Sequence, residues 1–494
     1  MELSATEKLV REGFARGAPV DLGPADDQVV RAEVLRHLLL GGVPAADGEL
    51  PGLRLQHARV TGRLELSYAD VTVMVILNDC RFDERITLHG AHLRRLNLAG
   101  STLNGIAAEN ATIAGGLSLR YAVVHGTIDL IGTRIEGALV LDGARLSAAS
   151  PSPGGAPPPP GGALPSSGGA GPGGALPALD GSHLSVASSI LARDGFVSDG
   201  PIWLGGATVA GSLRWCGATI RNPGGRALDA PGLKVGGVAD LTDGFTVAGS
   251  IRLSNAEVGG LLSLHGAELS EPGGRCLDLR NLVAGEVNLR PRTPFPGRVD
   301  LSYARISLLR DDPATWPEQI ATTDFRYEAI GGPAEVGERL RWLQRDPHGF
   351  RPQAYSQLAG VYQAAGRDDD ARTVRYAAER NRSRKNRIWS ALQNVTVGYG
   401  YKPVRAASWL GALLAAGTVL FTLVEPRAAE APKAPEFHAL AYTADLLLPV
   451  VDLGQQSAYH ARGWTAWVAY GLIGAGLVFV TTAAAAIARR LQRG

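Results

Sequence analysis

Two aspartates lie in an unusually apolar stretch near the end of the chain, residues 437–453. Asp445 and Asp452 stand there beside Tyr442 and Pro449. The stretch is too short and too interrupted to cross a bilayer but too apolar for an ordinary loop, which is typical of a re-entrant or interfacial helix. Carboxylates that enter a bilayer must line water or pair with a basic group, whereas on its surface they are solvated. These four residues are the candidate functional residues, and both interpretations remain open.

Three other aspartates, Asp180, Asp229 and Asp278, recur at a spacing of 49 residues. Equal spacing in a repeating fold would place their side chains in one row, as a ladder of carboxylates. The favoured interpretation is that each carboxylate closes a turn by accepting a hydrogen bond from a backbone amide, as Asp commonly does. The ladder remains the alternative.

No recognised catalytic, cofactor or metal motif accompanies these residues. A Gly-x-Gly-x-x-Gly match occurs only at 169–174, where no strand precedes it and no helix follows, so it does not indicate a dinucleotide site. Cys80, Cys216 and Cys276 lie far apart, which argues against a disulfide framework or a zinc cluster and for a reducing compartment. We therefore expect no catalytic residue, no cofactor and no metal, and the sequence favours a non-enzymatic protein.

A repeated motif, apolar-x-Gly-x-apolar-x-Leu, indicates which elements position these side chains. Neighbouring copies are 11 residues apart, and a longer period of 49 residues runs from Leu179 to Val283. The alternation of apolar and variable residues is typical of short strands with one inward face, and a single repeat cannot bury that face alone. The sequence therefore predicts a mainly β protein, a parallel and right-handed β-helix. Clear copies begin at Val60, Ile113, Val124, Ile135, Val209, Val247 and Val258.

Changes of pattern divide the chain into four predicted regions. Residues 1–52 form an N-terminal helical cap, and residues 53–310 form the solenoid. Residues 148–178 are almost entirely Pro, Gly, Ala and Ser and are expected to be a flexible insertion into one turn. Residues 311–400 have helical periodicity and form a C-terminal helical shoulder, and residues 401–494 form a membrane hairpin.

The membrane hairpin is predicted from two segments that contain no charged residue, 406–424 and 464–487. As helices they would be about 28 and 36 Å long, enough for two transmembrane helices. Basic residues flank their outer ends, so the positive-inside rule predicts that the solenoid and both termini face the cytoplasm from the inner (plasma) membrane. The whole chain has 49 basic and 47 acidic residues, a balance that argues against nucleic acid as a partner.

Several motifs outside the repeat resemble one family. The chain is similar over nearly its whole length, except the Pro/Gly insertion, to actinobacterial β-solenoid membrane proteins that are distantly akin to pentapeptide-repeat proteins. Members are often labelled membrane-associated oxidoreductase, so the resemblance implies that activity, but it assigns no catalytic residue to this chain. The motifs that carry the resemblance are Val30-Arg31-Ala32-Glu33-Val34-Leu35, Arg339-Leu340-x-Trp342-Leu343, Tyr355-x-Gln357-Leu358-Ala359, Gly398-Tyr399-Gly400-Tyr401-x-Pro403 and Tyr442-x-x-Asp445-x-x-x-Pro449-Val450-Val451-Asp452-Leu453-Gly454-Gln455.

These features predict a membrane-anchored cytoplasmic scaffold or sensor that binds an unidentified protein partner along its solenoid. The alternative is a channel-like membrane protein with a re-entrant segment at 437–453, which requires a homo-oligomer because one hairpin cannot enclose a pore. A membrane-associated oxidoreductase, from the family label only, is the second alternative.

Overall fold

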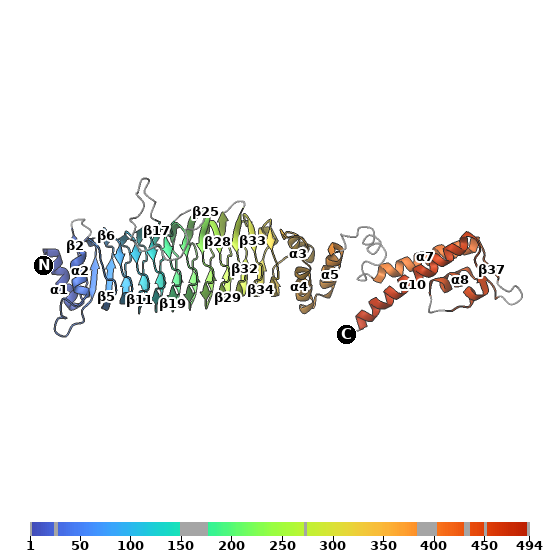
Figure 1. Ribbon diagram of the computed structural model, residues 1–494, viewed down its shortest axis with the longest axis horizontal. Helices are drawn as coiled ribbons and strands as arrows, with labels where there is room; N and C mark the ends of the chain where they lie inside the picture. Colours follow the sequence, from blue (N-terminus) through green and yellow to red (C-terminus); the bar gives the residue numbers. More distant parts are fainter. Residues whose placement is uncertain are drawn as a thin grey trace, which may run out of the picture. The chain divides into compact units, whose positions relative to one another are not determined.

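The chain forms two compact units, residues 1–357 and residues 358–494. Figure 1 shows the computed structural model, in which a long β-structure fills most of the first unit and helices fill the second. The structure describes residues 2–23, 28–148, 176–270, 274–382, 403–428, 435–448 and 452–491.

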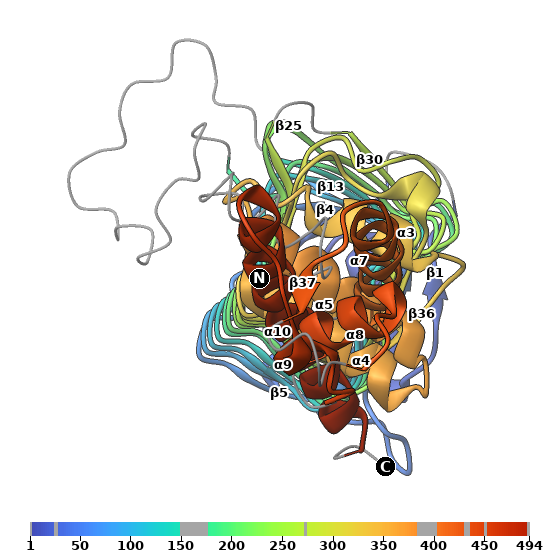
Figure 2. The same cartoon turned by 90° about the vertical axis from the view of Figure 1, so that its right-hand side faces the viewer.

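The first unit is a parallel β-solenoid of about 11 turns, which confirms the predicted β-helix. Among the described residues its strands form two sheets of 18 strands each. In a typical turn, β11 (Thr112–Ile113) and β12 (Leu117–Ser118) belong to one sheet, and β13 (Val123–His125) and β14 (Ile128–Asp129) belong to the other. Viewed along the axis of the solenoid, successive turns lie over one another (Figure 2).

The pairing of strands explains both sequence periods. Ile113 pairs with Ile135 one turn later, and Val124 lies between them in the other sheet, so 11 residues correspond to half a turn. Val209 pairs with Val235, which in turn pairs with Val258, so the 49-residue step crosses two turns. Neighbouring turns in this part of the solenoid therefore differ slightly in length, and only every second turn repeats closely.

Stacked apolar side chains form the core of the solenoid. One column contains Leu96, Leu117, Leu139, Ile190 and Leu213, each paired with the next and each almost completely buried. Burying each such side chain contributes roughly 1.5–3 kcal/mol, so the stack stabilises itself turn by turn.

Close approach of neighbouring turns explains why Gly recurs in the motif. A Cβ atom built on Gly259 would lie 2.3 Å from the carbonyl oxygen of Gly236, and one on Gly211 would lie 2.7 Å from that of Ser188. A side chain at either position would force the backbones of two turns apart, so glycine is needed there.

The N-terminal residues continue the solenoid as well as covering its end. Short strands β1 (Val20–Asp21) and β2 (Val29–Arg31) pair in parallel with β3 (Leu53–Gln56) and β4 (Arg59–Thr61), one in each sheet. Two helices, α1 (Ala5–Arg16) and α2 (Ala32–Leu39), accompany them. The buried Glu7 carboxylate lies 2.7 Å from Arg31 Nη2, and its hydrogen bond to that guanidinium lowers the pKa of Glu7 to about 2.

The strands continue past residue 310, where the solenoid was expected to end. Strand β34 (Arg305–Asp311) pairs with β36 (Arg326–Gly331), and helix α3 (Val336–Leu343) follows. A buried ion pair joins Arg339 of α3 to Asp311, whose Oδ2 also accepts a hydrogen bond from Trp316 Nε1 at 3.0 Å. This accounts for the arginine of the Arg-Leu-x-Trp-Leu motif. Helix α4 (Pro352–Ala364) contains the boundary between the two units, and α5 (Asp368–Arg382) belongs to the second.

The rest of the second unit is a small helical assembly. Its core brings together Phe421, Tyr442, Leu446, Leu447 and Leu472. The elements are α7 (Pro403–Leu423), β37 (Arg427–Ala428), α8 (Ala439–Leu447), α9 (Gln455–Ala458), β38 (Tyr459–His460) and α10 (Trp464–Leu491).

The prediction of two transmembrane helices, at 406–424 and 464–487, is wrong. Both segments are helical, within α7 and α10, but no helix in the described part of the chain is long and apolar enough to cross a membrane. The prediction relied on the absence of charge, but an uncharged segment is equally suited to packing inside a protein. Both segments contribute to the core of the helical assembly, α7 through Phe421 and α10 through Leu472.

Candidate binding surface

A row of side chains, all but one of them charged, follows one strand position of the second sheet through seven successive turns. Each member pairs with the next in the parallel register, so the row runs along the solenoid. The three aspartates spaced by 49 residues belong to it, but they lie on every second turn because other residues occupy the turns between. We call the row the aspartate column; it consists of Asp129, Asp180, Trp203, Asp229, Arg252, Asp278 and Asp300.

Most aspartates of the column close the turn that follows their strand. Asp180 Oδ1 accepts a hydrogen bond from the backbone N–H of Ser182 at 3.0 Å, and Asp278 Oδ1 accepts one from Arg280 at 3.3 Å. The favoured interpretation of these two residues as turn caps is therefore confirmed. Asp229 differs, because Pro231 stands at the same offset and has no N–H to donate.

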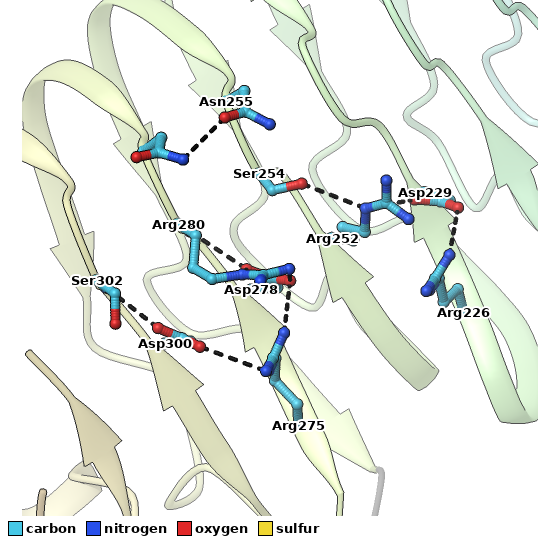
Figure 3. Close-up of polar contacts among 11 residues, drawn as sticks. Arg226, Asp229, Arg252, Ser254, Asn255, Arg275, Asp278, Arg280, Asp300 and Ser302 are labelled. Carbon is cyan, nitrogen blue, oxygen red and sulfur yellow. Dashed lines mark hydrogen bonds and ion pairs between the residues drawn. The ribbon is translucent and has the colours of Figure 1, made fainter. Parts of the chain in front are cut away.

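Arginine side chains surround Asp229, as Figure 3 shows. Arg226, three residues earlier in β25 (Thr219–Asp229), donates from Nη1 to Asp229 Oδ2 at 3.2 Å. Arg252, the next member of the column in β28 (Thr246–Arg252), places Nε 3.4 Å from Asp229 Oδ1. One carboxylate therefore interacts with guanidinium groups from two different turns.

Two guanidinium groups also pair with Asp278, in β31 (Arg275–Asp278), but here both come from the same turn as the carboxylate. Arg280 donates from Nε and Nη2 to the two carboxylate oxygens at 2.9 and 2.8 Å, and Arg275 Nη1 donates to Oδ2 at 2.9 Å. Burial alone would raise the pKa of Asp278, but the hydrogen bonds from Arg280 outweigh it and hold that pKa below its ordinary value. Arg275 also lies 3.5 Å from Asp300.

The column therefore has an arginine-paired half, in which three carboxylates face four guanidinium groups. We define this half as Asp229, Asp278 and Asp300 with Arg226, Arg252, Arg275 and Arg280.

The earlier turns form an acidic half, which we define as Glu109, Asp129 and Asp180. Burial, together with hydrogen bonding to Glu109 and repulsion from Glu109 and Asp180, raises the pKa of Asp129 to about 7. Arg85 Nη2 is 4.0 Å from the Asp129 carboxylate, at the outer limit of an ion pair, and His89 Nδ1 is 3.9 Å from Glu109. Negative charge is therefore poorly compensated here, although Asp129 and Asp180 occupy the same backbone position as the aspartates of the arginine-paired half. Glu109 lies beside the column, two residues after Ala107, which pairs with Asp129.

This geometry suits binding of a cation more than catalysis. Asp129 and Asp180 stand at a fixed spacing on the sheet, and Glu109, in the turn after β10 (Ile106–Ala107), is 40% exposed. In the described ranges, no group of three or more His, Cys, Asp or Glu side chains has the arrangement of a metal site. The chemistry available is the attraction of a positively charged group to clustered carboxylates.

The four residues singled out in the sequence lie in the second unit, and the structure gives the described ones structural roles. Asp445 is buried, and its carboxylate accepts backbone N–H groups from Leu453 at 2.5 Å, Gln455 at 2.8 Å and Gln456 at 3.1 Å. These hydrogen bonds join α8 to Leu453 and to the start of helix α9. Asp452 is exposed and accepts a hydrogen bond from Gly454 N at 2.8 Å.

Tyr442 belongs to the core of the helical assembly. Its ring meets Phe421 edge to face, with centroids 4.9 Å apart, and burial raises the pKa of its hydroxyl. The sequence did not single out Gln455, whose side chain donates to the carbonyl oxygen of Glu436 at 3.1 Å. Its place at the end of the Tyr-to-Gln motif was the available signal. Pro449 lies outside the described residues.

The cysteines have no shared site. Cys80 and Cys276 are buried, as expected of small core residues, and burial raises the pKa of the Cys80 thiol to about 12. Cys216 is half-buried and donates from Sγ to Asp240 at 3.2 Å.

No family model, no curated protein and no solved structure matches the chain. The fold places the protein in the class of parallel β-solenoids, and the family resemblance stays a prediction.

Proposed function

We propose that this β-solenoid is a protein-binding scaffold that holds a basic segment of a partner protein against the acidic half of the aspartate column. The observation that supports the proposal is the contrast within that column. Three carboxylates share four guanidinium groups in one half, whereas in the other half burial and the neighbouring carboxylates raise the pKa of Asp129 to about 7.

The energetic argument follows from this imbalance. Carboxylates that repel one another in a partly buried site destabilise their own charged forms. A lysine or arginine of a partner would reduce the repulsion. The electrostatic contribution to the binding free energy is therefore larger there than at a surface that arginines already neutralise. The rigid parallel sheet adds to the effect, because it holds the carboxylates in position before the partner arrives.

A peptide experiment tests the chemistry of the surface. We expect a short arginine-rich peptide to bind the full chain at pH 8, and the double variant Glu109→Gln/Asp129→Asn to weaken binding about tenfold or more. Binding to the wild type should also weaken below pH 6, because Asp129 is then protonated. Isothermal titration calorimetry at several salt concentrations measures both effects.

The control variant is Glu257→Gln, which removes an exposed carboxylate from the other sheet, where it lies 3.3 Å from Lys234. Equal loss of affinity in the control and the double variant would contradict the proposal. A photo-reactive residue at Ile131, two positions after Asp129, then captures the partner in its native cells. The proposal would also be refuted if the captured segment had no basic residues, or if it bound the double variant as tightly as the wild type.

A further inference from the structure

Trp203 is the one uncharged member of the aspartate column. Its neighbours in the column are Asp180, one turn earlier, and Asp229, one turn later. Ile202 and Leu204, on either side of it in the sequence, are buried in the core, whereas Trp203 is only half-buried. The indole therefore lies on the outer surface of the second sheet, between the strand positions of two aspartates.

The residue at the equivalent position of the next repeat is an arginine. Arg252 stands 49 residues after Trp203 and, like it, between two aspartates of the column. Its Nε lies 3.4 Å from Oδ1 of Asp229, the aspartate of the preceding turn (Figure 3). The later repeat thus supplies its own cation at this position, and the earlier repeat supplies an aromatic ring.

The other two positions that hold arginine in the arginine-paired half are also uncharged near Asp180. Asp278 pairs with arginines three residues before it and two residues after it. At the same offsets from Asp180 the sequence has Pro177 and Ser182. Among the described residues, no basic side chain forms an ion pair with Asp180. Asp180 therefore lacks all three guanidinium groups that the pattern of the later turns would give it.

The Asp180 carboxylate keeps one oxygen that the described chain does not use. Asp180 is 8% exposed, and its Oδ1 accepts hydrogen bonds from the backbone N–H and the hydroxyl of Ser182 at 3.0 and 2.7 Å. Its Oδ2 accepts none from the described residues. Neighbouring strands lie about 4.8 Å apart, so a cation stacked on the Trp203 ring would lie close to this carboxylate.

We propose that the basic segment bound at the acidic half places an arginine on Trp203, with its guanidinium stacked on the indole and directed toward Asp180. The inference rests on the proposed function, because it identifies one side chain of the same partner. A planar guanidinium can stack on an aromatic ring and pair with a carboxylate at its edge, whereas the ammonium of lysine is compact and strongly hydrated. Trp203 therefore selects arginine over lysine.

Two peptides that differ only in having arginine or lysine test this selection. We expect the full chain to bind the arginine peptide about fivefold more tightly or better at pH 8, and Trp203→Leu to reduce the preference to less than about twofold. Trp203→Phe, which keeps an aromatic face, should restore part of it. The control Trp467→Leu removes an exposed indole from the second unit and should leave the preference unchanged. Isothermal titration calorimetry measures each affinity, and circular dichroism verifies that each variant is folded.

Trp203→Arg tests the comparison with the next repeat. The new guanidinium should pair with Asp180 as Arg252 pairs with Asp229, so we expect the arginine peptide to bind about tenfold more weakly while the solenoid stays as stable as the wild type. The control Thr208→Arg adds the same charge at an exposed position of the other sheet and should weaken binding by about twofold or less. Equal weakening by the two variants would overturn the inference.

The outcomes separate this inference from the proposed function. An arginine preference that survives Trp203→Leu, or equal binding of the two peptides by the wild type, would overturn the inference and leave the proposed function intact. A preference that Trp467→Leu also abolishes would overturn it in the same way. If the wild type binds neither peptide, the proposed function and the inference both fail.

Discussion

The two halves of the aspartate column have the same backbone and opposite electrostatics. Asp129 and Asp278 occupy the same register position, and each follows a completely buried apolar residue. Arg280 and Arg275 neutralise Asp278, whereas Asp129 has Glu109 as its hydrogen-bonding neighbour. The difference teaches that the inward side chains maintain the stack, while the outward side chains of each turn are free to be balanced or left charged.

The largest losses of stability are expected when inward-facing apolar side chains are truncated. These losses should be similar in the two halves of the column. Ile128 and Leu277 precede Asp129 and Asp278, and neither is exposed to solvent. We expect Ile128→Ala and Leu277→Ala each to cost about 2–5 kcal/mol, from lost burial and the cavity left behind. Urea unfolding followed by circular dichroism measures both. A cost confined to one half would show that the halves also differ in their core.

The next largest effect is the loss of stability when a carboxylate is removed from its arginine partners, and it should appear only in the arginine-paired half. Asp278→Asn leaves the guanidinium groups of Arg275 and Arg280 without their carboxylate, and we expect a loss of about 1–3 kcal/mol of stability at pH 7. The matched control is Asp324→Asn, at an exposed turn residue with a φ of 48°, a conformation that Asn tolerates. Similar losses in both variants would contradict the role of the arginines.

Removing the charge of an aspartate in the acidic half should raise the stability of the solenoid, whereas Asp278→Asn lowers it. The folded-state pKa of Asp129, about 7, lies above its ordinary value of 3.8, so the folded protein holds the proton more tightly than the unfolded chain. The contribution of this group is therefore favourable below pH 4 and is lost as the pH rises to about 7.

We expect Asp129→Asn to stabilise the solenoid by about 1–2 kcal/mol at pH 8 and to leave its stability at pH 4 unchanged. Urea unfolding at the two pH values measures the change. Destabilisation at pH 8 would mean that the hydrogen bond from Ile131 N to Asp129, at 3.2 Å, outweighs the repulsion.

The smallest effect is expected from a substitution that gives the acidic half an arginine like those of the arginine-paired half. Ile131 is half-buried and stands two residues after Asp129, the offset at which Arg280 follows Asp278. Ile131→Arg should lower the pKa of Asp129 and raise stability at pH 8 by about 0.5–1 kcal/mol. The uncharged variant Ile131→Gln is the control. A pH dependence of unfolding that remains as steep as in the wild type would contradict the prediction.

Much of the solenoid could be predicted because its physics is local in sequence. Alternating apolar residues, with Gly where turns approach closely, allow little other than stacked short strands. The same reasoning located the helices of the second unit but assigned them the wrong role, as transmembrane helices. A run without charge was interpreted as a bilayer segment, but residues such as Gly417 and Ala469 serve close packing between helices of the same unit.

The binding surface was only partly visible in the sequence. Asp180, Asp229 and Asp278 share the 49-residue period, which spans two turns, but Asp129 and Asp300 do not, because each lies only one turn from its neighbour in the column. Among the arginines, Arg226 and Arg275 also share that period, but Arg252 and Arg280 do not. Asp445 and Asp452 attracted notice because charge is rare in an apolar stretch. Asp452 accepts a hydrogen bond from a backbone amide two residues later, whereas the partners of Asp445 are 8 to 11 residues away and only the tertiary structure brings them to it.

The sequence by itself determined that alternate side chains point inward and stack, because strand periodicity and burial depend on neighbouring residues. Only the tertiary structure decided which charges meet. Arg252 approaches Asp229 from the following turn, whereas Asp129 meets Glu109 from the preceding one. Contacts between turns join residues about 20 or more positions apart, and their register depends on the length of every intervening loop.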